Sequence, residues 1–397
     1  MNHNPRRSAR VESASPRLRR ILSLDDFEAA ARRCLPRPIF GYVASAAEEN
    51  LSHAKNREAF SQWALTPRVL VGVSARTQEV ELFGCKYASP FGIAPMGLSA
   101  LSAYRGDLVQ TRAAKAAGIP MVLSGGSLIR LEEVMAEAPD TWFQAYVPGD
   151  EAKIRALLAR VQASGCKTLV VTVDIPVMGN RENAVRSGFS APLRPSLRLA
   201  WDGAIRPRWL LGTFVRTLMC HGMPHFENSL AERGAPVLSA TVMREHTARD
   251  RLNWNHLALI RQLWKGVLIV KGILNPADAR LAREQGVDGL WVSNHGGRQM
   301  DGAVTALQVL PEILEEAAGR PVFIDGGVRR GSDVLKALAA GASMVFVGRP
   351  FNYASAVGGE AGVTHAIQLL RDEIDRNMGM LGVNTCQDLQ GDMLRRW

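Results

Sequence analysis

The stretch Leu290-Trp-Val-Ser-Asn-His-Gly-Gly-Arg-Gln299 joins an apolar run to a histidine, two glycines and an arginine. The apolar residues predict a buried strand, and His295 and Arg298 follow it directly. A base and a cation at the end of a buried strand are typical of a site built on a rigid scaffold. A histidine at a strand end is more often structural than catalytic, so the remainder of the chain has to decide between the two interpretations.

The length and composition allow one large α/β barrel or two ordinary domains. The chain has 397 residues, of which 47% are hydrophobic, and this is ample for a core. Its five cysteines are widely scattered and form no CxxC pair. This pattern indicates reduced thiols in a cytosolic setting. It argues against a disulfide framework and against a zinc site, and we expect no bound metal.

The formal charge of +10 is concentrated at the N-terminus, where residues 1–20 hold six arginines and one glutamate, a net +5. A basic tail can contact nucleic acid or anionic lipid but is usually solvated, so we expect residues 1–22 to form a basic, flexible tail. The tail has no apolar segment of the kind found in secretory signals. No aromatic-basic motif accompanies the tail, so nucleic acid is not an expected partner. The uncharged stretch 87–104 contains Pro90 and Pro95, which favour strand and loop over a membrane-spanning helix.

Two helices are predicted between Leu24 and Asn50. Ser23 can cap the first of them, and Pro36 and Pro38 break it. The second is expected over 39–50 and carries Tyr42.

From residue 91 onward, short apolar runs alternate with amphipathic segments. The eight runs, each expected to be a strand, are Phe91–Ala94, Met121–Ser124, Trp142–Val147, Thr168–Val173, Val267–Val270, Gly289–Ser293, Val322–Ile324 and Met344–Val347. The expected helices are Asp107–Ala117, Leu131–Ala138, Asp150–Ser164, Trp254–Trp264, Pro276–Gln285, Ala306–Ala318 and Asp333–Ala340. Continuous apolar strands alternating with helices indicate a parallel sheet covered by helices. Eight such units predict an α/β fold of the TIM (β/α)8 barrel type, as a single domain over 23–397. An open doubly wound sheet is the alternative, but no GxGxxG follows the first strand.

A long insertion, about 188–253, interrupts this alternation after the fourth strand. It contains no clean strand and combines tryptophans and leucines with six arginines over 188–240. Long insertions in barrels act as lids or docking surfaces on the catalytic face. An arginine-rich segment with exposed apolar residues also suits a membrane interface. The sequence supports a lid and membrane contact equally.

Polar residues and glycines gather at the predicted strand ends, which converge on one mouth of a barrel. They are Pro95, Met96, Gly97, Ser124, Gln144, Tyr146, Thr172, Asp174, Lys271, Ser293, His295, Arg298, Asp325, Gly326, Gly327, Arg329, Gly348 and Arg349. The last two loops, 325–331 and 347–350, combine glycines with arginines, and both groups bind phosphate oxygens. We therefore expect a phosphorylated ligand at these loops.

The middle strands supply groups for acid–base chemistry. His295 is a candidate general base, and Asp174 is a candidate to orient it and stabilise the imidazolium. Arg181 and Arg298 are two cations suited to a substrate carboxylate. Lys271 ends a buried apolar run, where a ligand that carries or develops negative charge would offset the cost of burying the ammonium. Together these groups suggest redox chemistry on a carboxylic acid with a bound phosphorylated cofactor.

The segment Ser293-Asn-His-Gly-Gly-Arg-Gln-Met-Asp301 resembles the signature of the FMN-dependent L-2-hydroxy acid oxidising enzymes. That family includes glycolate oxidase, L-lactate dehydrogenase and L-mandelate dehydrogenase, and the resemblance extends from about Leu24 to Leu389. It implies FMN as the cofactor and oxidation of an (S)-2-hydroxy acid to a 2-oxo acid. It also implies a homo-oligomer, commonly a tetramer.

The resemblance assigns a role to each candidate residue. The catalytic residues would be His295, Asp174, Tyr146, Arg298 and Tyr42. The residues that bind the substrate would be Tyr42, Tyr146, Arg181, His295 and Arg298. The residues that bind FMN would be Pro95, Met96, Gly97, Ser124, Gln144, Thr172, Lys271, Ser293, Asp325, Gly326, Gly327, Arg329, Gly348 and Arg349.

Two positions depart from the glycolate oxidase pattern. Gly126 stands where glycolate oxidase has a tryptophan, which implies a larger pocket for aromatic or longer aliphatic acids. Gly97 stands where the oxidases typically have alanine and in this resembles the dehydrogenases. With the insertion, these features imply an L-lactate or L-mandelate type dehydrogenase that passes electrons to a quinone, in the cytoplasm or peripherally on the inner face of the membrane. An oxidase that uses oxygen and releases hydrogen peroxide is the alternative.

Overall fold

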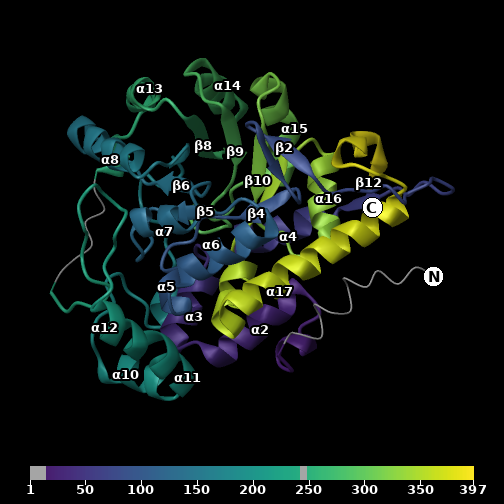
Figure 1. Ribbon diagram of the computed structural model, residues 1–397. Coiled ribbons are helices and arrows are strands. Elements are labelled where there is room, and N and C mark those ends of the chain that lie inside the picture. The colour runs from purple at the N-terminus through teal and green to yellow at the C-terminus, as the bar shows by residue number, and fades with distance from the viewer. Residues whose placement is uncertain (1–14, 242–247) are drawn as a thin grey trace.

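The computed structural model describes residues 15–241 and 248–397 (Figure 1). Most of the expected basic tail, residues 1–14, therefore lies outside the described residues. The expected end of the tail at residue 22 is too late, because Leu18 and Ile21 are both buried in the main core. Leu18 belongs to a 3-10 turn, η1 (Leu18–Arg20), and packs beside Gly358.

Eight parallel strands form one sheet that curls into a barrel, as predicted. They are β4 (Phe91–Ile93), β5 (Val122–Ser124), β6 (Trp142–Ala145), β7 (Thr168–Thr172), β8 (Val267–Ile273), β9 (Gly289–Val292), β10 (Val322–Asp325) and β11 (Met344–Val347). The hydrogen-bonded order is β4-β11-β10-β9-β8-β7-β6-β5, and a parallel bridge between Ile93 and Met121 brings the first strand beside the second. The (β/α)8 barrel is thus confirmed, and the open doubly wound alternative is wrong.

Aromatic side chains fill the interior of the barrel. The rings of Trp291 and Phe346 lie 4.1 Å apart, and those of Trp142 and Phe323 lie 5.9 Å apart. A hairpin of β2 (Val80–Leu82) and β3 (Cys85–Tyr87) carries Phe83, whose ring lies 6.1 Å from Phe323. This packing leaves the carboxyl ends of the strands as the end of the barrel where a ligand can bind.

Helices cover the barrel on the outside (Figure 1). They are α5 (Ser99–Ser102), α6 (Gly106–Ala117), α7 (Leu131–Glu137), α8 (Glu151–Ala163), α13 (Trp254–Leu263), α14 (Pro276–Glu284), α15 (Ala306–Ala317), α16 (Gly331–Ala339) and α17 (Arg349–Leu381). α17 packs against α6 and against the N-terminal helix α2 (Leu24–Cys34), and it is kinked at Gly359. After α17 the chain forms the 3-10 turns η4 (Cys386–Asp388) and η5 (Gly391–Met393) and the short strand β12 (Leu394–Arg396). β12 pairs antiparallel with β1 (Trp63–Leu65).

The N-terminal helices differ in part from the prediction. α2 begins after Ser23, whose capping box with Asp26 confirms the predicted start. The helix predicted over 39–50 is wrong in its second half: α3 (Arg37–Ala44) ends early, and a further helix, α4 (Leu51–Ser61), follows. The intervening backbone is held by distant side chains, since the Asp301 carboxylate accepts hydrogen bonds from the N–H groups of Glu49, Leu51 and Ser52. Local sequence alone does not reveal such tertiary contacts.

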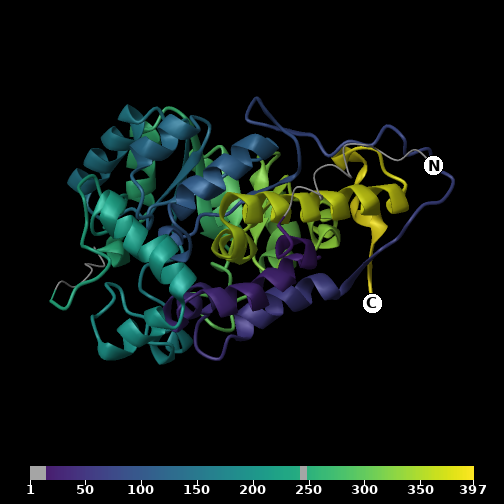
Figure 2. The same cartoon turned by 60° about the horizontal axis from the view of Figure 1, so that its bottom comes forward.

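The insertion follows β7, as predicted, and its helices lie mainly between Leu197 and His221. α9 (Glu182–Arg186) precedes it, and its own elements are α10 (Leu197–Ala204), α11 (Pro207–Trp209), a π-helix η2 (Leu210–Val215), α12 (Arg216–His221) and the 3-10 turn η3 (Arg249–Arg251). Figures 1 and 2 place α10–α12 at one end of the molecule, beside α3 and α5. In the described part of the chain, no helix has the length and apolar character needed to cross a membrane.

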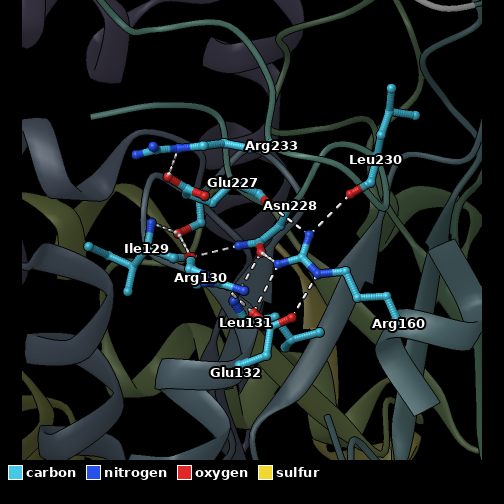
Figure 3. A network of polar contacts seen from close by, with 10 residues as sticks. Ile129, Arg130, Leu131, Glu132, Arg160, Glu227, Asn228, Leu230 and Arg233 are labelled. Carbon is cyan, nitrogen blue, oxygen red and sulfur yellow. Dashed lines mark hydrogen bonds and ion pairs between the residues drawn. The ribbon is translucent and has the colours of Figure 1, made fainter. Parts of the chain in front are cut away.

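A polar network joins the returning part of the insertion to the barrel (Figure 3). Arg160 of α8 donates to Glu132 at 2.8 Å and to the carbonyl of Glu227 at 2.7 Å. Asn228 donates to the carbonyl of Ile129 at 2.7 Å, in the loop between β5 and α7. The charge and hydrogen bond of Arg160 lower the pKa of Glu132 to about 2. The insertion is therefore built into the rim of the catalytic face and not attached by its two ends alone.

Candidate active site

A cavity of about 640 Å³ opens at the carboxyl ends of the strands, within the range of small-molecule and cofactor sites. Seventeen predicted residues line it: Tyr42, Pro95, Met96, Gly97, Gln144, Tyr146, Thr172, Arg181, Lys271, His295, Arg298, Asp325, Gly326, Gly327, Arg329, Gly348 and Arg349. The other three stand directly behind the wall. Ser124 donates to Gln144, Asp174 pairs with His295, and Ser293 contacts Lys271.

His295 and Asp174 form the acid–base pair that the sequence predicts. His295 Nδ1 lies 3.0 and 3.1 Å from the two Asp174 carboxylate oxygens. Burial acts to raise the pKa of Asp174, but the charge and hydrogen bond of His295 outweigh it and the net pKa is lowered. An ionised carboxylate only accepts, so Nδ1 carries the hydrogen and Nε2 is the basic nitrogen of the neutral ring. Burial lowers the pKa of His295, and Asp174 offsets only part of this effect.

The backbone at His295 and the two glycines after it is left-handed. His295, Gly296 and Gly297 all have left-handed φ values of 59°, 64° and 73°. A Cβ at Gly297 would lie 2.5 Å from the backbone nitrogen of His53, so only glycine fits there. A non-glycine residue in this region costs about 1–3 kcal/mol and is common at functional sites. The two glycines after His295 are therefore required by the turn.

Lys271 is a buried cation in a network with Ser293 and Asp325. Its ammonium lies 2.8 Å from the Asp325 carboxylate and donates to Ser293 Oγ at 2.6 Å. Burial acts to lower the pKa of Lys271, but the charges of Asp325 and Asp174 outweigh it and raise the pKa. β8 continues past Lys271 to Ile273, beyond the predicted end, with an irregularity at Gly272. A Cβ at Gly272 would lie 2.6 Å from that of Asp174, so glycine is needed for the two strands to approach here.

Arg181 and Arg298 lie together on the cavity wall. Arg298 Nη1 donates to the carbonyls of Tyr42 at 3.0 Å and Ser45 at 2.8 Å, at the C-terminus of α3. Arg181 donates to the carbonyl of Arg298 and to the Gln299 side chain. Burial, with the nearby charge of Arg298, lowers the pKa of Arg181 to about 10. These hydrogen bonds go to neutral oxygens, so the pair keeps its positive charge for an anionic ligand.

Tyr42, Gly97 and Gly126 lie together in one corner of the cavity. A Cβ at Gly97 would lie 3.1 Å from the Tyr42 hydroxyl oxygen and 3.4 Å from the carbonyl oxygen of Gly126. The Tyr42 ring stacks on Phe189 at 4.5 Å, and the guanidinium of Arg298 lies 5.0 Å from its centroid. Gly97 therefore leaves room for the hydroxyl, and Gly126 contributes no side chain to the wall.

Positive charge is concentrated around the two late loops. Burial lowers the pKa of Arg349 to about 9, and Arg298 adds to this effect. His53 of α4 has a pKa lowered to about 3 by burial and then by the charges of Arg349 and Arg329. Gly348 is the N-cap of α17 and no side chain caps it. Helix N-termini and clustered arginines both bind anions, so this end of the cavity suits a phosphate.

α4, which the sequence analysis missed, supports these loops. Asn56 and Asn294 exchange side-chain hydrogen bonds of 2.8 and 2.9 Å. A Cβ at Gly327 would lie 2.1 Å from the carbonyl oxygen of Asn56, and both Gly326 and Gly327 have left-handed φ values of 92° and 84°. The last residue of the quoted signature, Asp301, binds the start of the same helix. Asp301 in the signature was the one available clue to this contact.

Two buried polar atoms of residues on the cavity wall show whether the site fits the expected flavin. Gln144 Nε2 and Thr172 Oγ1 are buried and make no hydrogen bond to any residue within 15–241 or 248–397. Buried polar groups are rarely left unpaired, so both require a partner in the cavity. The flavin ring of FMN presents carbonyl and nitrogen atoms that can pair with them, and the basic loops suit its phosphate. The residues present therefore fit FMN.

Among the charged residues of the cavity lining in the described part of the chain, Arg249 alone was not predicted. Arg249 of η3 lines the cavity, and its guanidinium lies 4.6 Å from the centroid of the Tyr146 ring. It lies at the end of the insertion, outside every predicted strand end. The pattern of strands and loops therefore contained no signal for it.

Comparison with known proteins agrees with this geometry. The model of the FMN-dependent dehydrogenase family matches residues 31–396. The (S)-mandelate dehydrogenase of Pseudomonas putida is 36% identical over 376 residues, covering 94% of each chain. An L-lactate dehydrogenase of Caulobacter vibrioides is 39% identical over 379 residues, covering 94% of this chain and 97% of the relative.

Solved structures show the same relationship. A crystal structure described as the monotopic membrane protein (S)-mandelate dehydrogenase superposes with a TM-score of 0.87 and 35% identity, covering 95% of this chain and 100% of that one. A mandelate oxidase with (S)-2-phenylpropionate gives 0.78 and 34%, covering 95% and 98%. The chain belongs to the FMN-dependent dehydrogenase family, uses FMN and oxidises a 2-hydroxy acid.

Proposed function

We propose that the protein oxidises an (S)-2-hydroxy acid of the L-lactate or (S)-mandelate type and passes the electrons to a quinone at a membrane surface. The observation that supports this most is the placement of His295, Arg181 and Arg298 on one cavity. Its wall also carries Gln144 and Thr172, whose Nε2 and Oγ1 atoms have no hydrogen-bond partner among the described residues. A base and a carboxylate clamp beside a flavin-sized cavity are the groups that hydroxy acid oxidation needs.

Each residue has a role that follows from its contacts. Arg181, Arg298 and the Tyr42 hydroxyl bind the substrate carboxylate and so fix the position of the carbon to be oxidised. His295 Nε2 then accepts a proton from the substrate, and Asp174 stabilises the imidazolium that forms. FMN, when bound, supplies the electron acceptor. Lys271 keeps a buried positive charge beside the cavity, where it stabilises negative charge that develops during the reaction.

The pH dependence of flavin reduction tests the His295–Asp174 pair. His295 must be neutral to act as a base, so the rate should fall as the pH drops through its pKa, which burial lowers from the usual value for histidine. Asp174 raises that pKa, so Asp174→Asn should move the fall to still lower pH. The plateau rate should also fall, by about 10²-fold, because the imidazolium loses its counter-charge. Stopped-flow reduction from pH 4.5 to 9 measures both effects, and a fall that moves to higher pH in the variant would contradict this assignment.

The membrane proposal rests on exposed apolar side chains of the segment α10–α12. Leu197, Trp201, Leu211 and Met219 are 92, 67, 64 and 81% exposed. Exposed arginines of the same segment, such as Arg208 and Arg216, suit anionic lipid headgroups. The (S)-mandelate dehydrogenase whose crystal structure superposes on this chain is described as a monotopic membrane protein. We propose a peripheral location on the inner face of the cell membrane, with the remainder of the protein in the cytoplasm.

Replacing Leu197, Trp201 and Met219 together by glutamine should release the protein from anionic lipid vesicles, because these side chains supply the apolar area for binding. Co-sedimentation with vesicles measures the bound fraction. A matched control replaces Val69 and Leu70, which are 82 and 103% exposed on a loop elsewhere. Equal binding by all three proteins would favour a simple lid.

The electron acceptor separates the two candidate activities. After anaerobic reduction by substrate, the enzyme should be reoxidised much faster by a soluble quinone than by dissolved oxygen. Rapid reoxidation by oxygen with stoichiometric hydrogen peroxide would support the oxidase alternative, which the similarity to a mandelate oxidase keeps open. The homotetramer implied by the family stays a prediction, to be tested by light scattering.

A further inference from the structure

A third guanidinium lies at the substrate end of the cavity. Arg249 is 4.6 Å from the centroid of the Tyr146 ring, and the Tyr146 ring is 6.4 Å from that of His295. Arg249 therefore lies near the proposed base, and all three residues line the cavity. It belongs to η3, an element separate from those that carry Arg181 and Arg298.

The turn that carries Arg249 is fixed to the loop after β6. The Gly149 N–H donates to the carbonyl of Ala248 at 2.9 Å. A Cβ at Gly149 would lie 2.6 Å from the backbone carbon of Arg251, so the two backbones are in direct contact. Since the same loop carries Tyr146, the backbone itself sets the position of Arg249 relative to the Tyr146 ring.

The chemistry of these groups indicates the ligand. Arg181 and Arg298 lie together and provide one carboxylate site. Arg249 offers a second guanidinium fork, of the geometry that carboxylates bind in a bidentate manner. Gly126 lines the same cavity without a side chain, which leaves space for a short methylene chain. A ligand with a carboxylate at each end carries a group for each of these two sites.

We propose that Arg249 is a specificity-determining residue that binds a second carboxylate, so that the enzyme prefers (S)-2-hydroxydicarboxylic acids. The proposal rests on the proposed function, because the first carboxylate and the hydroxyl take the places given to them there. The second carboxylate lies beside the Tyr146 ring and accepts hydrogen bonds from Arg249. The enzyme therefore prefers 2-hydroxy acids that carry a negative charge at the end opposite to the first carboxylate.

The test compares (S)-2-hydroxyglutarate with its 5-amide, which has the same shape but lacks the second charge. With the FMN-loaded enzyme, kred/Kd from anaerobic stopped-flow reduction should be about 10- to 100-fold higher for the acid, the factor for one charge-assisted hydrogen bond. Arg249→Met should reduce this ratio to near one, and Arg249→Lys should retain part of it. Arg251→Met removes a charge from the same turn on an exposed residue outside the cavity and should leave the ratio unchanged.

A ratio near one in the native enzyme, or an unchanged ratio in Arg249→Met, would overturn the proposal. If L-lactate or (S)-mandelate reduces the flavin while the acid and amide behave alike, the proposed function stands and only the specificity proposal fails. If none of these 2-hydroxy acids reduces the flavin, the proposed function fails as well.

Discussion

Replacing His295 by alanine is expected to leave FMN bound and to slow its reduction by substrate about 10²- to 10⁴-fold. The phosphate end of the cavity, with Arg329 and Arg349, lies on other strands and loops, so the cofactor site should persist. Only the basic Nε2 is lost from the neighbourhood of the substrate. Anaerobic stopped-flow absorbance measures the rate, and the ratio of flavin to protein absorbance measures FMN content.

The strained backbone at His295 requires a second variant. Its φ of 59° is unfavourable for alanine but tolerated by asparagine, so His295→Asn removes the base with less disturbance of the turn. Both variants should bind FMN and both should be slow. His225→Ala, in the insertion and outside the cavity, is the matched control. Reduction at the native rate in His295→Asn would remove His295 from its assigned role.

Replacing Lys271 by methionine is expected to cost about 3–5 kcal/mol of unfolding free energy. The substitution removes the cation 2.8 Å from Asp325 and leaves a buried carboxylate without its counter-charge. FMN content should also fall, because the wall then presents negative charge towards an anionic cofactor. Chemical denaturation and the flavin absorbance of the purified protein measure the two effects.

A double variant separates stability from chemistry. Lys271→Met with Asp325→Asn removes both charges, so much of the lost stability should return. Flavin reduction should be slow in both variants, because each lacks the buried Lys271 cation that stabilises developing negative charge. Full activity in the double variant would show that the pair is structural only.

The fold could be predicted because its periodicity is local. Each barrel strand is a continuous apolar run, and all eight were predicted within three residues of their observed ends. The end of α3 was placed too late and α4 was missed, since the backbone between them is held by Asp301 and Arg298 from a distant loop. Such contacts leave no periodic signal in the segment itself.

The site was predictable for a similar reason. In a parallel barrel, the strand ends converge, so His295, Lys271 and Asp325 could be placed together before their contacts were known. The resemblance to a family then supplied roles that residue chemistry alone left open. Asn56 and Arg249 could not be found, because each lies on an element outside the alternation of strand and helix. Their functions come from tertiary packing, which sequence spacing does not encode.

The most direct test of the central claim is the absorbance spectrum of the purified, FMN-loaded protein under anaerobic conditions. Addition of (S)-mandelate or L-lactate should bleach the absorbance band of oxidised flavin at roughly 450 nm. The (R)-enantiomers should leave this band unchanged, because the Arg181–Arg298 clamp and His295 face one side of the substrate. A protein that binds no FMN, or a flavin that no (S)-2-hydroxy acid reduces, would contradict the account.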